Sequence, residues 1–164
     1  MIRSAIFIYA CFCIWAYFYT DRMIFLPQPS TYEDTQDILK LTTANGVSIS
    51  AIYLPNPQAK YTILYSHGNA EDLGDGLPLL KELRDIGFSV FAYDYQGYGT
   101  SQGTPSERNA YKDIDAAYNY LTQELNIPPN RIIAYGFSVG GGPSVDLAAR
   151  KPLAGLIVEN TFIS

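Results

Sequence analysis

The sequence is poor in charge, and above all in basic residues. Lys and Arg number 11 against 16 Asp and Glu, the formal net charge is −5, and charged residues make up 16% of the 164 positions. Lys and Arg nowhere form a run. A nucleic-acid-binding domain needs a basic face, so we expect no nucleic-acid partner. Hydrophobic residues make up 48% of the chain, which excludes disorder and predicts one domain with a sizeable core.

Cysteine and histidine are nearly absent. Cys11 and Cys13 stand one residue apart in an apolar run, and His67 is the single His. The two cysteines cannot frame a disulfide-rich fold, and with one distant His they do not have the spacing of metal ligands. We therefore expect no metal site. We interpret the cysteines as small apolar residues of a hydrophobic segment; the alternative is that one of them is lipidated near a membrane surface.

The N-terminus carries an uncharged segment that is rich in apolar and aromatic residues. Residues 4–20 contain no charge, and Arg3 precedes them while Asp21 and Arg22 follow. As a helix they would rise about 25 Å, slightly less than a ~30 Å hydrocarbon core. Aromatic residues crowd the C-terminal half, where an interfacial belt would lie. We predict that residues 1–26 form an uncleaved membrane anchor, which makes the protein a single-pass membrane protein. A cleaved signal peptide, for which no small-residue cleavage site is visible, and a buried core helix are the alternatives.

Residues 27–164 alternate between strand and helix patterns. Runs at 37–43 and 47–54 flank an Asn-Gly pair, which favours a hairpin turn. Later apolar runs lack in-and-out alternation, as buried parallel strands do; they lie at 61–67, 88–94, 131–137 and 153–160. Helical patterns separate them: a leucine stripe stops at Gly87, and a capping box headed by Thr104 opens the next helix. The fold class is therefore α/β, an antiparallel hairpin followed by parallel strands with helices on both faces.

A serine sits in a glycine-framed turn between the strand run at 131–137 and a helix that extends to about Arg150. Gly136 and Gly140 flank Ser138 at two residues on either side. A serine on such a turn is held in a strained conformation that exposes its hydroxyl, and the glycines remove side chains that would clash. The N–H of Val139 would point into the same space at a helix N-terminus. The pattern predicts a nucleophile elbow; a plain helix cap or a phosphate-binding turn is the alternative.

A second turn follows the strand at 61–67, with the sequence "SHGNAED" at residues 66–72. Gly68, next to His67, lets the backbone pass close to a substrate. The N–H of Asn69 can then pair with that of Val139 to form an oxyanion hole. A third turn, residues 93–107, is glycine-rich and lies at the same rim of the predicted sheet. We interpret Asp94, at its start, as a turn residue rather than an acid catalyst.

Together these segments resemble the α/β-hydrolase superfamily, and within it a membrane-anchored serine-hydrolase branch. That branch contains the bud-emergence-type hydrolases and the α/β-hydrolase-domain protein depalmitoylases. The resemblance covers almost the whole chain and rests on five segments in the order and spacing of the family: "FLP" at 25–27, "SHGNAED" at 66–72, "DYQGYGTSQGTPSE" at 94–107, "GFSVGGGPSVDLA" at 136–148 and "LIVENTF" at 156–162.

The resemblance implies Ser138 as nucleophile and the N–H groups of Asn69 and Val139 as oxyanion donors. It also implies activity on acyl esters, thioesters or amides without a metal or cofactor. In this family a catalytic Asp and then a catalytic His follow the nucleophile. The sequence has neither after Glu159, which we interpret as structural. His67 lies in the oxyanion turn, where the family has a His that is not the base, so we assign it a supporting role.

We therefore expect an incomplete α/β-hydrolase domain at residues 27–164, with the last strands missing and with activity only when the C-terminal part is present. A second chain that completes the sheet would serve the same purpose. The alternatives are a catalytically incompetent hydrolase fold that binds a partner at a membrane, and a gene fragment. The expected substrate is an acylated small molecule or protein.

Overall fold

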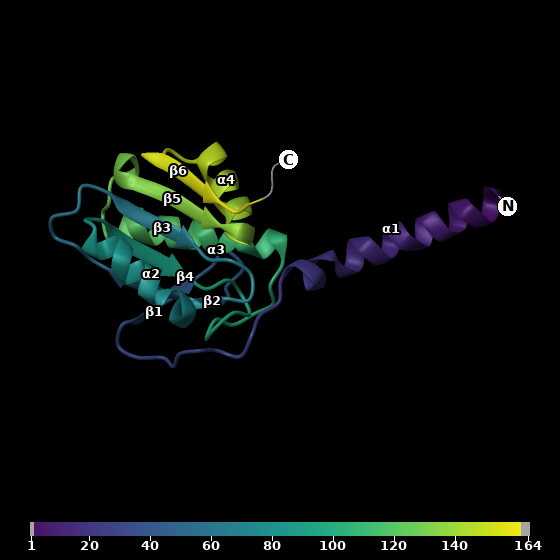
Figure 1. Ribbon diagram of the computed structural model, residues 1–164, viewed down its shortest axis with the longest axis horizontal. Coiled ribbons are helices and arrows are strands. Elements are labelled where there is room, and N and C mark those ends of the chain that lie inside the picture. The colour runs from purple at the N-terminus through teal and green to yellow at the C-terminus, as the bar shows by residue number, and fades with distance from the viewer. Residues whose placement is uncertain (1, 162–164) are drawn as a thin grey trace.

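Six strands form one mixed sheet in the computed structural model, which describes residues 2–161. The strand order is β1-β2-β4-β3-β5-β6, and Figure 1 shows the sheet with helices packed along it. The strands are β1 (Ile38–Thr42), β2 (Ser48–Leu54), β3 (Thr62–Ser66), β4 (Ser89–Tyr93), β5 (Ile132–Phe137) and β6 (Gly155–Glu159). The main helices are α1 (Ile2–Ile24), α2 (Leu73–Asp85), α3 (Glu107–Asn119) and α4 (Gly141–Arg150).

The predicted hairpin and strands are confirmed. β1 and β2 pair antiparallel around Gly46, whose φ of 77° suits a tight turn. β2 also pairs antiparallel with β4, and β4, β3, β5 and β6 then run parallel. Each strand lies within its predicted run. The carboxyl ends of the parallel strands therefore meet at one rim of the sheet, where reactive groups gather in such folds.

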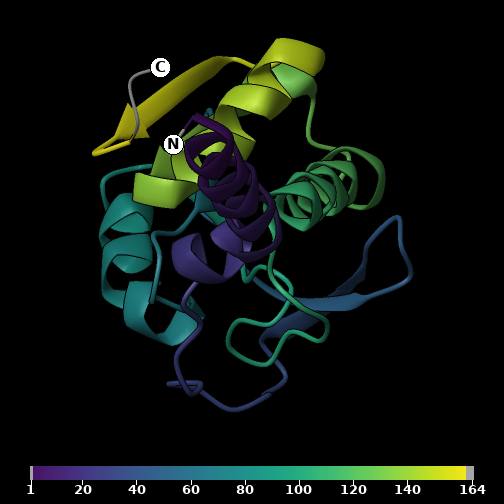
Figure 2. The same cartoon turned by 90° about the vertical axis from the view of Figure 1, so that its right-hand side faces the viewer.

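Helices cover both faces of the sheet, as predicted for an α/β fold (Figure 2). On one face, Leu73 and Leu80 of α2 pack against a cluster that includes Tyr65. On the other, α3 and α4 contribute Ile114 and Leu147 to a larger core. All four side chains are buried, which explains why the strands between them lack alternation of polar and apolar residues. The leucine stripe of α2 ends where it was predicted to, because Gly87 adopts a φ of 116°.

The predicted start of α3 is wrong by two residues. The side chain of Ser106 accepts a hydrogen bond from the N–H of Asn109 at 3.2 Å, so Ser106 is the N-cap and Glu107 is the first helical residue. Thr104, the expected cap, only offers its carbonyl oxygen to the Asn109 side chain. Ser106 lies directly beyond the fixed Pro105 ring and has extended backbone angles, which a cap requires.

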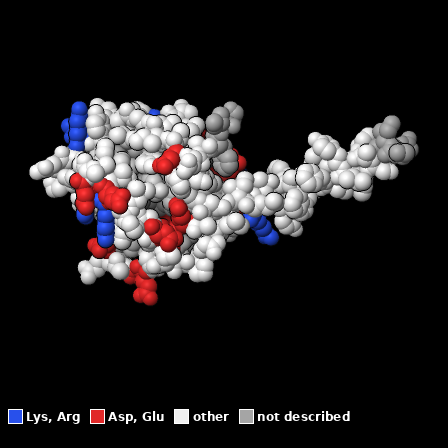
Figure 3. Space-filling model, viewed as in Figure 1, with Lys and Arg blue, Asp and Glu red and all other residues white. Residues whose placement is uncertain are grey.

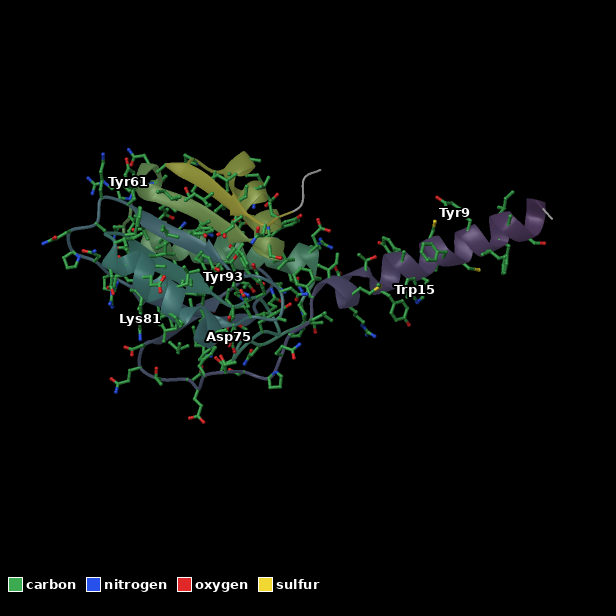
Figure 4. The ribbon with its side chains drawn as sticks, in the orientation of Figure 1. Tyr9, Trp15, Tyr61, Asp75, Lys81 and Tyr93 are labelled. Atoms are coloured by element: carbon green, nitrogen blue, oxygen red, sulfur yellow. The ribbon has the colours of Figure 1, made fainter. Side chains whose placement is uncertain are left out.

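The N-terminal residues form a long helix, but it does not support the predicted membrane span. α1 has 23 residues and extends away from the sheet (Figure 1). Tyr9 and Trp15 lie on the part of α1 that is away from the sheet (Figure 4). Most of its visible surface carries no charge (Figure 3). Nevertheless, within residues 2–161 no helix combines the length and the apolar character needed to cross a membrane. Hydroxyl-bearing residues such as Tyr9 lower the hydropathy of the segment.

β6 forms one edge of the sheet. It pairs with β5, and its exposed apolar side chains include Leu156, Ile157 and Val158, at 41%, 44% and 45% exposure. Among residues 2–161, no strand pairs with the other side of β6. An apolar strand with unpaired backbone groups is a template for pairing with a further strand.

Candidate active site

Ser138 occupies the sharp turn between β5 and α4. Its φ is +52°, in the left-handed region that non-glycine residues rarely adopt. The residue opens a single turn of 3-10 helix that leads directly into α4. Strain of this kind costs about 1–3 kcal/mol and persists where the surrounding structure enforces it, often at functional sites. The backbone geometry is the one expected of a nucleophile elbow.

The two glycines that frame Ser138 are required by close backbone approach. A Cβ atom on Gly136 would lie far inside 3.0 Å of the carbonyl oxygen of Gly140. A Cβ atom on Gly140 would clash in the same way with the carbonyl oxygen of Ser66, at the end of β3. The elbow can therefore fold only if both positions lack a side chain. It is pressed against the neighbouring turn that follows β3, because β3 pairs with β5 and Ser66 lies opposite Gly136.

The predicted oxyanion turn lies directly beside the elbow. A Cβ atom on Gly68 would lie 2.9 Å from the Phe137 ring, so the turn needs glycine here to pack against β5. Among residues 2–161, no acceptor takes the N–H of Asn69. Val139 is the second residue of a helical turn, where N–H groups have no acceptor within the helix. Two adjacent turns thus each present a backbone donor at the same rim.

His67 belongs to the oxyanion turn, and it is buried there. Its side chain is 3% exposed, and its Nδ1 lies 2.7 Å from the carbonyl oxygen of Gly68. The Tyr95 ring packs against the His67 ring at a tilt of 48°, with 4.4 Å between ring centroids, and the Tyr95 hydroxyl donates to the His67 carbonyl oxygen at 2.8 Å. No hydrogen bond links His67 to Ser138 in the described part of the chain. These contacts hold the turn and agree with a supporting role for His67.

Asp94 does more than the turn residue that the sequence predicted. It is fully buried at the end of β4, and its Oδ1 lies 3.4 Å from His67 Nε2 and accepts the first N–H of α2, from Leu73, at 3.0 Å. Its other oxygen accepts the hydroxyl of Tyr32 at 2.5 Å. Burial raises the pKa of Tyr32, and the Asp94 charge raises it further. The carboxylate therefore joins three segments beneath the site. The only feature of the sequence that could have indicated this role is the position of an acidic residue at the end of a buried strand.

A second buried carboxylate, Asp113 of α3, holds the glycine-rich loop after β4. It accepts the backbone N–H of Gln96 at 2.9 Å and the Gln96 side-chain amide at 2.7 Å. Burial raises the pKa of Asp113 to about 6, although both hydrogen bonds act in the opposite direction. Sequence reasoning missed this residue because it falls among the helix positions of an amphipathic pattern. No group of three or more His, Cys, Asp or Glu side chains within residues 2–161 is arranged to hold a metal ion.

An apolar cavity of about 240 Å³ adjoins the elbow. Three structural elements contribute to its wall: Ile24 and Phe25 at the end of α1, Ala110 and Tyr111 of α3, and Val139 and Pro143 around the start of α4. Val139, whose N–H is one of the two predicted oxyanion donors, therefore also lines this cavity.

The order of the strands and the strand-turn-helix elbow at Ser138 define the chain as an α/β-hydrolase. Comparison with known proteins agrees with this assignment. The sequence model of the family described as serine aminopeptidase, S33, matches residues 57–164. The chain belongs to this family.

Curated relatives place it more narrowly by similarity. It is 47% identical over 114 residues to the alpha/beta hydrolase domain-containing protein aho-3 of Caenorhabditis elegans, covering 67% of this chain and 33% of the relative. It is 42% identical over 137 residues to the human alpha/beta hydrolase domain-containing protein 17B, covering 82% of this chain and 48% of the relative. The chain therefore spans at most about half the length of these relatives.

Solved structures support the fold. The Pyrococcus furiosus esterase Pf2001 superposes with a TM-score of 0.68 at 20% identity, over 79% of this chain and 56% of that protein. An α/β-hydrolase from Vibrio vulnificus superposes with a TM-score of 0.62 at 24% identity, over 74% of this chain and 44% of that protein. At such identities the likeness extends to the fold alone.

Proposed function

We propose that the chain is the nucleophile-bearing part of a serine hydrolase that cleaves acyl esters, thioesters or amides. The observation that carries the proposal is the left-handed backbone of Ser138 between two obligatory glycines. A strained serine at a strand-to-helix turn is typical of hydrolase nucleophiles. Its attack on an acyl carbonyl creates a negative oxygen, which the N–H groups of Asn69 and Val139 would stabilise.

The general base and the acid would come from outside residues 2–161. The single His of the chain, His67, is engaged below the oxyanion turn. The match covers only 33% and 48% of the lengths of these two relatives, and in the family order an Asp and then a His follow the serine. Without a base the hydroxyl of Ser138 is a poor nucleophile, and an oxyanion hole with binding alone leaves roughly 10³–10⁴-fold acceleration over water.

The apolar cavity favours an acyl group with a hydrocarbon chain. It has the chemistry of a fatty acyl site, because its wall is mainly hydrophobic and Val139 stands at the predicted oxyanion hole. We also propose that α1 attaches the protein to a membrane surface. Its exposed apolar side chains, such as Phe7 and Ile8 at 70% and 67% exposure, support this assignment.

Fluorophosphonate labelling tests the proposed nucleophile. The reagent is applied to the chain and to a hybrid hydrolase, in which residues 1–164 are followed by the part of human alpha/beta hydrolase domain-containing protein 17B that lies beyond its match. We expect rapid labelling of the hybrid hydrolase at Ser138, slow labelling of the chain alone, and none in Ser138→Ala. A hybrid hydrolase that unfolds cooperatively and yet stays unlabelled would contradict the proposal.

The open edge of the sheet favours a second candidate function, a binding protein without catalytic activity. Leu156, Ile157 and Val158 are exposed apolar side chains of β6, which pairs with β5 on one side and, within residues 2–161, with no strand on the other. A second chain that adds a strand here would bury them. This candidate predicts that the folded hybrid hydrolase stays unlabelled, while the chain alone associates in sedimentation experiments.

A further inference from the structure

The segment that follows α1 crosses the rim of the sheet beside the oxyanion turn. We call residues 25–32 the strap. At its start Phe25 is 6% exposed, packed edge-on against Tyr95 with 6.3 Å between ring centroids. At its end, the N–H of Thr31 donates to Asp72 at 2.7 Å, and the Thr31 hydroxyl donates to the same carboxylate. Both ends of the strap are thereby fixed to the domain, on either side of the turn.

Between these ends the strap contacts the oxyanion turn itself. The backbone N–H of Leu26 donates to the side-chain oxygen of Asn69 at 2.8 Å. The hydroxyl of Tyr98 donates to the same oxygen at 2.7 Å, and the N–H of Ala70 does so at 3.0 Å. One amide oxygen therefore gathers donors from the strap, from the glycine-rich loop and from its own turn.

The local backbone needs such support. Ala70 has a φ of 58°, which a residue with a side chain rarely adopts and which costs free energy unless neighbours enforce it. The three hydrogen bonds to Asn69 hold the turn in this shape. The N–H of Asn69 lies in the preceding peptide plane, between residues 68 and 69. Its direction is therefore linked to the shape of the turn through the backbone angles of Asn69 itself.

We infer that the strap and Tyr98 position the oxyanion donor of Asn69, acting through its side-chain oxygen. The side chain of Asn69 is then an anchor and its backbone N–H is the group that contacts the substrate. Tyr98 and Leu26 are positioning residues, since neither contacts the reacting atoms. The inference rests on the proposed hydrolase function, and it assigns the "FLP" segment a role in the reaction.

Tyr98 is suited to donate this hydrogen bond over the whole pH range in which the protein stays folded. It is 1% exposed, and burial raises the pKa of its hydroxyl to about 12. The hydroxyl therefore stays protonated and remains a donor at any pH at which the protein is studied. Tyr98→Phe removes this donor alone. A matched control is Tyr118→Phe: Tyr118 is 5% exposed, and its hydroxyl donates to the carbonyl oxygen of Pro152 at 3.1 Å, on a different side of the domain.

Hydrogen exchange of the full chain tests the anchoring without any catalytic reaction. In Tyr98→Phe we expect the amide of Ala70 to exchange about fivefold faster, the equivalent of one net hydrogen bond. Tyr118→Phe leaves it unchanged. Asn69→Ala accelerates the exchange further, whereas Asn69→Asp, which retains an acceptor oxygen, keeps it slow. Equal exchange at Ala70 in Tyr98→Phe, Asn69→Ala and the parent would overturn the anchoring.

The rate of fluorophosphonate labelling tests the consequence for the reaction, in the hybrid hydrolase. We expect Tyr98→Phe to lower the rate about tenfold at saturating reagent, with half-saturation unchanged, because misplacing the donor weakens the transition state more than binding. Tyr118→Phe labels at the parent rate. If the parent labels and Tyr98→Phe labels as fast, the positioning inference is wrong while the hydrolase function stands. If the parent does not label, the function fails, and the exchange result still decides whether Tyr98 and the side-chain oxygen of Asn69 hold the turn.

Discussion

The carbonyl oxygen of Ser66 lies so close to Gly140 that a Cβ atom on that glycine would fall far inside 3.0 Å of it. The two residues belong to different turns, after β3 and within the elbow, and the contact presses the two turns together. The obstacle is a backbone atom at the carboxyl end of β3, a strand that is paired on both sides, so it cannot move aside as a flexible side chain would.

Gly140→Ala is therefore expected to destabilise the fold strongly. We predict a loss of about 3 kcal/mol in the free energy of unfolding, measured by urea titration of the chain. The matched control is Gly142→Ala, two residues further along. A Cβ atom on Gly142 meets nothing within 4 Å, and α4 gains a better helix former there. That variant should be more stable by about 0.5 kcal/mol. Equal stabilities of the two variants would refute the close packing of the turns.

The strain at Ser138 predicts an unusual ranking of two substitutions. Ser138→Gly relieves the left-handed backbone, whereas Ser138→Ala retains it, and both remove the hydroxyl. Strain relief of about 1–3 kcal/mol is partly offset by the greater freedom of glycine in the unfolded chain, about 0.4–1 kcal/mol. We expect the Gly variant to be more stable than the Ala variant by about 1 kcal/mol in thermal or urea unfolding. At an ordinary helical or strand position the order would be reversed, so a more stable Ala variant would argue against the strained elbow.

The apolar cavity beside Val139 predicts a dependence on acyl-chain length. Gly142 forms part of its wall, and a larger side chain there finds open space. Gly142→Leu in the hybrid hydrolase should leave acetyl ester hydrolysis within about twofold of the parent while lowering octanoyl ester hydrolysis about tenfold, because one to two kcal/mol of apolar contact is lost. Gly76→Leu, in α2 and with equal space around its Cβ, is the control. The same loss for both esters would show that the cavity does not hold the acyl chain.

Local patterns predicted the strands, the helices on both faces and the glycine-framed turn at Ser138, because each depends on neighbouring residues and on short-range sterics. What the sequence did not reveal lies in contacts between distant segments. The hydrogen bond from Leu26 to Asn69 joins residues 43 positions apart. Asp94 binds the N–H that opens α2 and the hydroxyl of Tyr32, and neither partner is adjacent to it in the sequence. Even the N-cap of α3 was missed by two residues, since several Ser and Thr near a proline are compatible with a cap.

Asp113 predicts a pH dependence of stability that one substitution should remove. Burial raises the pKa of its carboxyl from 3.8 to about 6. The folded protein therefore binds more protons than the unfolded chain between these values. The contribution of the Asp113 carboxyl to stability is complete below pH 3.8 and is lost as the pH rises through about 6. The shift corresponds to about 3 kcal/mol. The hydrogen bonds of Asp72 lower the pKa of the Asp72 carboxyl. The contribution of Asp72 to stability is therefore lost as the pH falls below 3.8, outside the pH range in which Asp113 acts.

We predict that the free energy of unfolding of Asp113→Asn, measured by urea titration from pH 4 to pH 8, declines less with rising pH than that of the parent. The difference should appear between pH 4 and pH 7 and level off above it, because the parent carboxylate is then fully ionised. Asp37→Asn, on the exposed surface, is the control for the loss of one carboxylate and should follow the parent curve. Parallel curves for Asp113→Asn and the parent would mean that the buried carboxyl ionises at its ordinary pKa and that Gln96 is held by a fully charged group throughout.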